Sequence, residues 1–190
     1  MHPFTAFFKE GLLHILDING ADHILFLLAV SAIYSLKDLK KLAWVSLSFT
    51  IAHSITLALT VFDVISIPSS IVEFLIAATI LFTCIENLWL KQLHHYRVII
   101  TGFFGLVHGM GFSTHLKELF MGMKFNVLET LLPFNLGLEL GQLIIILMAL
   151  LLITGICKAL NIKQLTLNYC ISLPVGIIAI YWLIERNIFC

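Results

Sequence analysis

Long apolar segments separated by short polar breaks are the feature that most restricts the fold of this chain. The apolar segments cover residues 22–36, 42–63, 69–90, 97–114, 129–156 and 166–185 of the 190 residues. A transmembrane helix needs about 20 consecutive, mostly apolar residues. Only 12% of the residues are charged, about half of the roughly 25% that is usual in soluble domains. The sequence therefore predicts an all-α polytopic membrane protein with about six transmembrane helices in one bundle, and a single membrane domain over residues 1–190.

The charged and sulfur-containing residues exclude other classes of protein. Lys and Arg together number 11, as do Asp and Glu, so there is no net positive field to attract a nucleic acid. The four cysteines form no C-x-x-C pair and no dense framework, which argues against a zinc finger and a disulfide scaffold. The first residues show no basic start followed by an apolar stretch and a small-residue cleavage site, so we expect no cleaved signal peptide.

The positions of the basic residues predict how the chain sits in the membrane. The loops on one side hold more of them, namely Lys37, Lys40, Lys41, Lys91, Arg97, Lys158 and Lys163. The segments on the other side hold Lys9, Lys117, Lys124 and Arg186. Because cytoplasmic loops are enriched in Lys and Arg, we expect both termini to lie outside.

Several ionisable and polar side chains interrupt the apolar spans. Each ionisable group costs about 2.5–3.5 kcal/mol at the centre of a membrane helix and usually faces a bundle interior or a cavity. The candidate metal ligands are His14, Asp22, His23, His53, Glu73, His108 and Glu139, and the supporting polar residues are Glu86, Asn135 and Gln142. We expect no interior Lys or Arg to neutralise the carboxylates, which favours a proton or a metal. A purely structural role, in hydrogen bonds between helices, stays open for His53 and His108 and is favoured for Asn135 and Gln142.

The depths of these residues predict a polar path through the bundle. With a rise of 1.5 Å per residue, His53, His108 and Glu139 fall near the midplane and are expected to share one central site. An outer mouth is expected from four residues: His14, Asp22, His23 and Glu73. The segment from Gly11 is expected to extend the first span or to form a re-entrant half-helix. Two G-x-x-x-G segments, at 105–109 and 137–141, predict close contact between the spans that carry them. Imidazole and carboxylate ligands together suit Ni²⁺, Co²⁺, Zn²⁺ or Fe²⁺.

Five short motifs carry a resemblance to a known family. They are G-A-D-H-I-L-F-L-L from Gly20, F-T-I-A-H-S-I-T-L-A-L from Phe49, V-E-F-L-I-A-A with I-E-N in the third span, F-G-L-V-H-G-M-G-F from Phe104, and F-N-L-G-L-E-L-G-Q-L from Phe134. In this order they resemble the HupE/UreJ family of nickel hydrogenase and urease systems, and its less characterised second branch most closely. By resemblance, the recurring polar positions of the family are Asp22, His23, His53, Glu73, Glu86, His108, Asn135 and Glu139.

The resemblance implies a permease for nickel or another divalent metal, or a metal-supply accessory protein, in the bacterial inner membrane. Its implied partners are the lipid bilayer, the divalent metal ion, and membrane or metalloenzyme-maturation proteins. Two features depart from the family pattern: His14 is followed by Ile15 where the nickel branch has proline, and the segment from His14 to His23 is about two residues longer.

Two other functions are compatible with the residues. A metal held by two histidines and a carboxylate, with one open position, is also the arrangement of a catalytic zinc site, so an intramembrane metal-dependent hydrolase is one alternative. The H-E-x-x-H and G-x-S-x-G signatures are absent from the sequence, which makes an enzyme the less favoured interpretation. The other alternative is a non-transporting assembly partner of a membrane complex.

Overall fold

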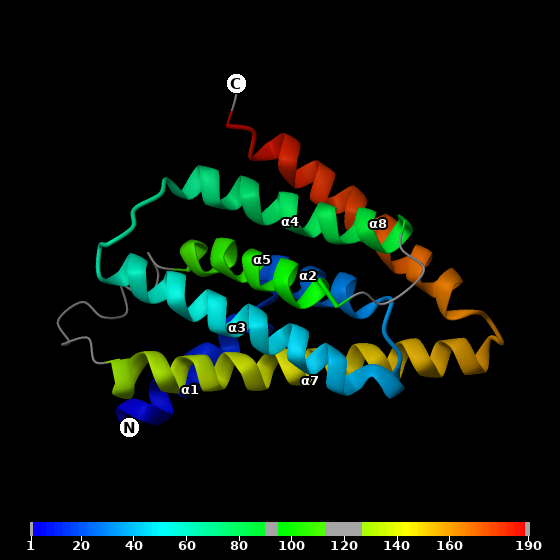
Figure 1. Cartoon of the computed structure of the whole chain (residues 1–190), viewed down its shortest axis with the longest axis horizontal. Helices are drawn as coiled ribbons and strands as arrows, with labels where there is room; N and C mark the ends of the chain where they lie inside the picture. Colours follow the sequence, from blue (N-terminus) through cyan, green and yellow to red (C-terminus); the bar gives the residue numbers. More distant parts are fainter. Residues whose placement is uncertain (1, 90–94, 113–126, 189–190) are drawn as a thin grey trace.

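The computed structural model describes residues 2–89, 95–112 and 127–188, and every regular element in these ranges is helical. The helices, shown in Figure 1, are α1 (Pro3–Leu16), α2 (Ala21–Ser31), α3 (Leu39–Val61), α4 (Ser69–Trp89), α5 (Arg97–Gly111), α7 (Leu132–Ala159) and α8 (Gln164–Glu185). Short 3-10 turns η1 (Ile18–Gly20) and η2 (Leu36–Asp38) precede α2 and α3, and a π-helical turn η3 (Val127–Leu131) precedes α7. The all-α prediction is confirmed.

The number of full-length spans is smaller than the sequence predicts. Four helical segments are long and apolar enough to cross a membrane: Leu36–Val61, Ser69–Trp89, Leu128–Ala159 and Gln164–Glu185. The bent pair α1 and α2, which meet at 67°, would add a fifth span if the two count as one. Helix α5 has 15 residues and is shorter than the roughly 20 that a span needs. Six full-length spans are therefore not confirmed within the described ranges.

The first predicted span, 22–36, has different boundaries in the structure. Helix α2 ends at Ser31, and α1 precedes it with a break at 17–20. The break falls at Asp17, Asn19 and Gly20, which favour turns over helix interiors because Asp and Asn bond to nearby backbone and Gly is flexible. The expected half-helix from Gly11 thus corresponds to the end of α1, which stops before α2 instead of continuing into it.

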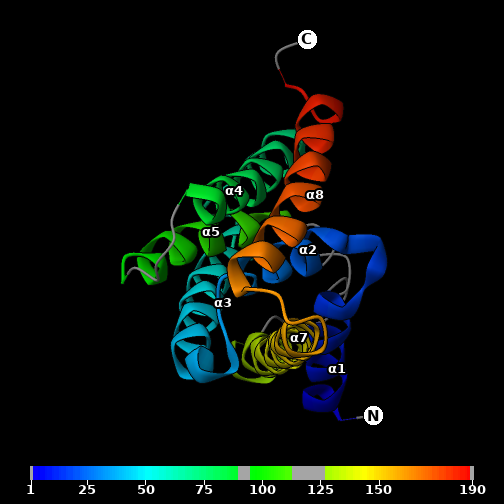
Figure 2. The ribbon, with the colours of Figure 1, turned by 90° about the vertical axis from the view of Figure 1, so that its right-hand side faces the viewer.

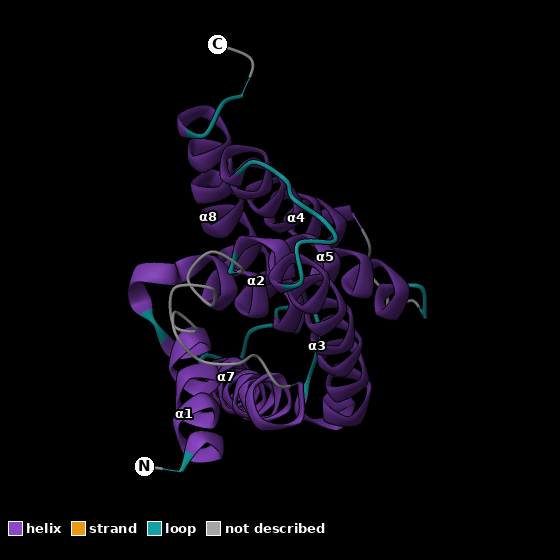
Figure 3. Ribbon diagram, turned by 90° about the vertical axis from the view of Figure 1, so that its left-hand side faces the viewer, coloured by secondary structure: helices purple, strands orange, loops and turns teal. Residues whose placement is uncertain are grey.

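Three helix pairs make the most extensive contacts, α3 with α5, α1 with α7, and α4 with α8. Helix α2 contacts α4, α7 and α8, and the view along the helices places it between the α4–α8 pair and the α1–α7 pair (Figure 2). The opposite view, coloured by secondary structure, shows the same helical layers without strands among the described residues (Figure 3). The short helix α2 is therefore surrounded by longer ones, and its histidine is buried.

Glycines let two of these pairs approach until their backbones touch. A Cβ added at Gly105 would overlap the carbonyl of Phe49, and one added at Gly137 would overlap the carbonyl of Phe8. The prediction that the two G-x-x-x-G segments pack on each other is wrong, because Gly105 and Gly109 contact α3, whereas Gly137 and Gly141 contact α1. A glycine motif shows that a helix has a small-residue face, but it does not say which helix covers that face.

The two ends of the bundle differ in their polar contacts. At one end the Gln164 side chain donates to the carbonyls of Ala32 and Tyr34 at 3.1 and 2.9 Å, and the Arg97 guanidinium lies 5.6 Å from the centre of the Tyr34 ring. At the other end Arg186 lies beside Glu73. Three of the basic residues used to predict the orientation in the membrane lie outside the described ranges: Lys91, Lys117 and Lys124.

Candidate metal centre

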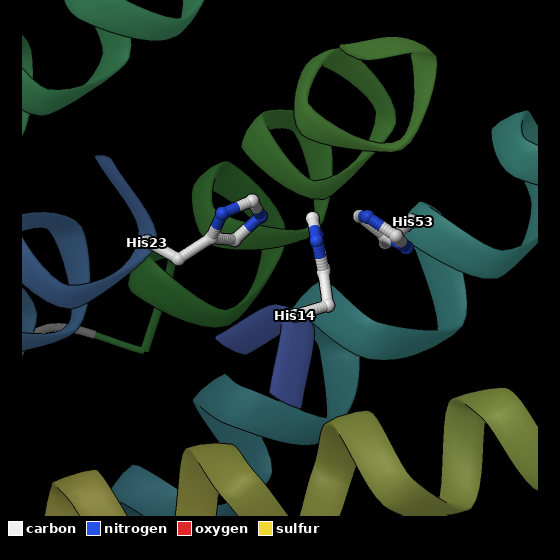
Figure 4. Close-up of side chains that lie close together, drawn as sticks. All are labelled: His14, His23 and His53. Atoms are coloured by element: carbon white, nitrogen blue, oxygen red, sulfur yellow. The ribbon is translucent and has the colours of Figure 1, made fainter. Parts of the chain in front are cut away.

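The break between α1 and α2 brings two histidines together. His14 lies in the last turn of α1 and His23 in the first turn of α2, and their ring centres are 4.8 Å apart. His53, from the middle of α3, completes the group at 6.4 Å from His14 and 6.2 Å from His23. Figure 4 shows the three imidazoles close together, on three different helices. A continuous first helix would place His14 and His23 about 13 Å apart along its axis, so the break creates the site.

The geometry of this cluster suits a metal ion. One ring nitrogen from each of the three histidines lies within 4.8 Å of the other two. Around a tetrahedral metal with metal–nitrogen distances of about 2.0–2.1 Å, the nitrogens lie about 3.3–3.4 Å apart. The rings therefore need only move together slightly to bind one ion. Imidazole is a common ligand of zinc, copper, iron and nickel.

His53 has no hydrogen-bond partner on either ring nitrogen within the described part of the chain, although its side chain is 0% exposed. A buried donor or acceptor that is left unsatisfied costs about 1–3 kcal/mol. His23 Nε2 is likewise buried without a partner. A metal ion bonded to one nitrogen of each ring would satisfy that nitrogen, whereas a histidine kept for helix–helix hydrogen bonding would already have its partner. The observation favours ligation over the structural role.

Asp22 acts on the neighbouring histidine ring. Its Oδ1 lies 3.2 Å from His23 Nδ1 and accepts a 2.9 Å bond from the His23 backbone N–H. An ionised carboxylate can only accept, so the proton of a neutral His23 ring is on Nδ1 and its Nε2 carries the lone pair. Metal-binding histidines usually donate their second ring N–H to a carboxylate in this way. Asp22 therefore orients a ligand nitrogen towards the cluster.

His108 lies against the cluster without belonging to the group of three. Its ring is 5.2 Å from that of His23, and its Nε2 is 3.0 Å from Thr79 Oγ1. The Thr79 hydroxyl donates its one proton to the Ile76 carbonyl at 2.7 Å. Because that proton is used, Thr79 accepts from His108, which places the ring proton on Nε2 and leaves Nδ1 as a bare acceptor. His108 Nδ1 is buried without a partner among the described residues.

A cavity of about 330 Å³ leads to the cluster. Its lining includes His14, Asp22, His23, Glu73 and His108. The structure thus brings together the residues of the predicted outer mouth. The lining also contains Arg186, whose Nε is 3.9 Å from Glu73 Oε2.

Glu139 is separate from the histidines. Its Oε2 is bonded to Thr50 Oγ1, and the nearby Gln142 Oε1 accepts from Ser46 Oγ at 2.7 Å. Of the predicted central trio of His53, His108 and Glu139, the group whose ligand atoms converge contains His53, together with His14 and His23.

Glu86 has a basic partner, which the sequence interpretation excluded. Its Oε2 accepts from Arg97 Nε at 3.0 Å and lies 2.9 Å from Arg97 Nη2. Both side chains are buried, with 8% and 4% exposure. The sequence places Arg97 at the boundary between a loop and the segment 97–114, and in the structure it is the buried first residue of α5. Glu86 is thus the partner of a structural ion pair. Asn135 is partly buried on α7 and its Oδ1 has no partner among the described residues.

Three polar residues at these sites escaped the sequence interpretation: Thr79, Arg97 and Arg186. Thr79 lies among apolar residues of α4, and its sequence neighbours give no sign that a histidine on another helix faces it. Arg186 follows the last span, 113 residues after the glutamate that it approaches. Long-range pairs of this kind leave no local pattern in a single sequence.

A helical, membrane-type bundle with a buried cluster of histidines beside carboxylates defines a polytopic membrane protein with a candidate metal site. The family model described as HupE / UreJ protein matches residues 1–186 of the chain. The chain belongs to the HupE/UreJ family, as its motifs predict, and is a metal-related accessory membrane protein. The comparisons with curated proteins and with solved structures give no match.

Proposed function

We propose that the protein is a permease for a divalent transition metal ion, with His14, His23 and His53 as the central ligands. The observation that carries the proposal is the convergence of three histidine nitrogens within 4.8 Å of one another in the bundle interior. Nickel, cobalt, zinc and iron(II) are the candidate ions, because each is bound by imidazole. The proposed location is the bacterial inner membrane.

The cavity supplies a route for the ion to this cluster. Asp22 and Glu73 place negative charge in its lining, which attracts a dication most strongly where water is partly excluded. The cavity lies at the Glu73–Arg186 end of the bundle. The opposite end carries the loop residues Lys37 and Lys163, and by the positive-inside rule it would face the cytoplasm. Both termini are then outside, and the cavity faces outwards for uptake.

Purified protein in liposomes gives the direct test. We expect the wild type to admit Ni²⁺, Co²⁺ or Zn²⁺ to a trapped metal-sensitive dye, and the His23→Ala variant to lose most of this flux. His95→Ala is the matched control, because His95 is exposed outside the helices. If folded His23→Ala admits the metal as fast as the wild type does, the assignment of the central ligands is refuted.

Binding to the same site should depend on pH in a defined direction. A histidine nitrogen must be deprotonated to bind a metal, and imidazole has an ordinary pKa of about 6.5. Metal affinity should therefore fall as the pH is lowered from 7.5 to 5.5, which titration calorimetry in detergent measures. An affinity that does not change over this interval would argue against histidine ligands.

The alternatives predict different outcomes in the same preparation. A metal-supply or assembly protein would bind the ion at the histidines without transmembrane flux. A metal-dependent hydrolase also needs a coordination position left open for water, and would cleave a membrane substrate only in the metal-loaded form. Metal binding at the histidines without transmembrane flux would therefore support one of these two functions instead of a permease.

A further inference from the structure

Three phenylalanines lie next to the buried histidines, on the helices α2, α3 and α5. Phe26 lies three residues after His23 on α2, and Phe49 and Phe104 lie four residues before the histidines of α3 and α5. On each helix the step from histidine to phenylalanine is about 4.5–6 Å and leads towards the end of the bundle at which Arg97 begins α5. The three rings form a second layer beside the histidines, the phenylalanine layer.

The rings of the phenylalanine layer contact one another and the histidines. The centre of the Phe26 ring lies 5.2 Å from that of Phe49 and 6.1 Å from that of Phe104, which are distances typical of packed aromatic pairs. The Phe49 ring lies 5.9 Å from His53 and 5.2 Å from His108. All three phenylalanines are buried. The layer therefore covers the imidazoles on the Arg97 side with side chains that have no polar atom.

Side chains fill the space between α2 and the α3–α5 pair. Helices α3 and α5 touch through their backbones at Gly105. Helix α2 packs mainly on α4 and α7, and it reaches α3 and α5 through the rings of His23 and Phe26. Because side chains can rotate while the helices stay intact, this space can open to an ion when the rings move.

Polar groups lie on both sides of the phenylalanine layer. The cavity described above is lined by histidines of α1, α2 and α5, and none of the three phenylalanines lines it. On the Arg97 side, Thr101 and Ser31 are buried, and Ser31 Oγ has no hydrogen-bond partner within the described ranges. A buried hydroxyl without a partner destabilises a fold, so packing alone does not explain this serine. The layer thus separates two polar regions of the bundle interior.

We propose that the phenylalanine layer is the barrier that sets the rate at which an ion passes from the histidine cluster towards the Arg97 end of the bundle. This inference rests on the proposed function. Hydrophobic constrictions in channels close by excluding water, and an ion without water or ligands is costly in an apolar region. The ion therefore stays at the histidines until the rings turn aside. Phe26 is the central residue of the barrier, because its ring contacts both of the others.

Flux and affinity together distinguish a barrier from ordinary core packing. In liposomes that contain a metal-sensitive dye, Phe26→Ala should admit Ni²⁺, Co²⁺ or Zn²⁺ about 10-fold faster than the wild type, which corresponds to a barrier about 1.4 kcal/mol lower. Phe26→Trp should admit the ion more slowly. Both variants should keep the Kd of the wild type, because neither changes a ligand. The matched control is Phe7→Ala, since Phe7 is a buried phenylalanine of α1 outside the layer, and its flux should equal that of the wild type.

Two results would overturn the barrier. The first is a folded Phe26→Ala variant that admits the metal no faster than the wild type, and Phe104→Ala carries the same test if Phe26→Ala does not fold. The second applies if the wild type admits none of the candidate ions, which refutes the proposed function. Liposomes with a pH-sensitive dye should then hold a pH gradient with the wild type and lose it with the double variant Phe26→Ala/Phe104→Ala, because protons cross along water that the layer excludes. A gradient held by the double variant overturns the barrier as well, whereas a lost gradient supports it.

Discussion

Replacement of His53 by leucine separates a metal ligand from a structural histidine. The His53 side chain is fully buried, and neither ring nitrogen has a hydrogen-bond partner among the described residues. Leucine has a similar volume and no polar atom, so it removes a buried unsatisfied group, which costs about 1–3 kcal/mol. We expect His53→Leu to raise the free energy of unfolding of the metal-free protein by about 1–3 kcal/mol. If His53 were retained for stability, the same substitution would lower the free energy of unfolding.

Metal should reverse this order of stability. A ligand that binds only the folded protein stabilises it by about 4.1 kcal/mol at a free concentration of 1,000 times its Kd. The wild type should gain this amount with the metal that it binds, while His53→Leu should gain little. Denaturant titration in detergent, with chelator and with metal, measures both effects, and His95→Leu serves as the exposed control. The reasoning is refuted if His53→Leu is less stable than the wild type with chelator, or if metal stabilises the two equally.

Three further predictions concern the surroundings of the site. Asp22→Asn should lower metal affinity about 10- to 100-fold, measured by calorimetry, and an unchanged affinity would remove Asp22 as the orienting group. Gly109→Ala should destabilise the protein by about 1–3 kcal/mol because its Cβ would overlap the His53 carbonyl, while Gly155→Ala, with open space around it, should leave thermal unfolding unchanged. Arg97→Met should lower the free energy of unfolding by about 3–5 kcal/mol, because it leaves Glu86 buried without its partner. Adding Glu86→Leu to this variant should restore most of the lost stability. If denaturant titration shows no such recovery, the broken ion pair is not the cause of the loss.

The sequence alone determined the class of protein and the approximate positions of most helices. Hydrophobic periodicity is a local property, so the apolar runs predicted helices that the structure places within a few residues, as at Ser69–Trp89 and Gln164–Glu185. His53 and Gln142 were predicted as polar residues within apolar spans that face the bundle interior, and both side chains are buried. The motifs were also sufficient to place the chain in its family.

Only the tertiary structure decided which polar residues meet. The turn at 17–20 folds His14 back towards His23, which no pattern of hydrophobicity encodes. Backbone contact at Gly105 and Gly109 sets the position of α5 against α3, and Thr50 on α3 bonds to Glu139 on α7. Depth along a helix follows from the residue count, because each residue adds 1.5 Å. The rotation and the partner of each helix depend on contacts between residues distant in sequence, and these contacts brought His14, His23 and His53 together.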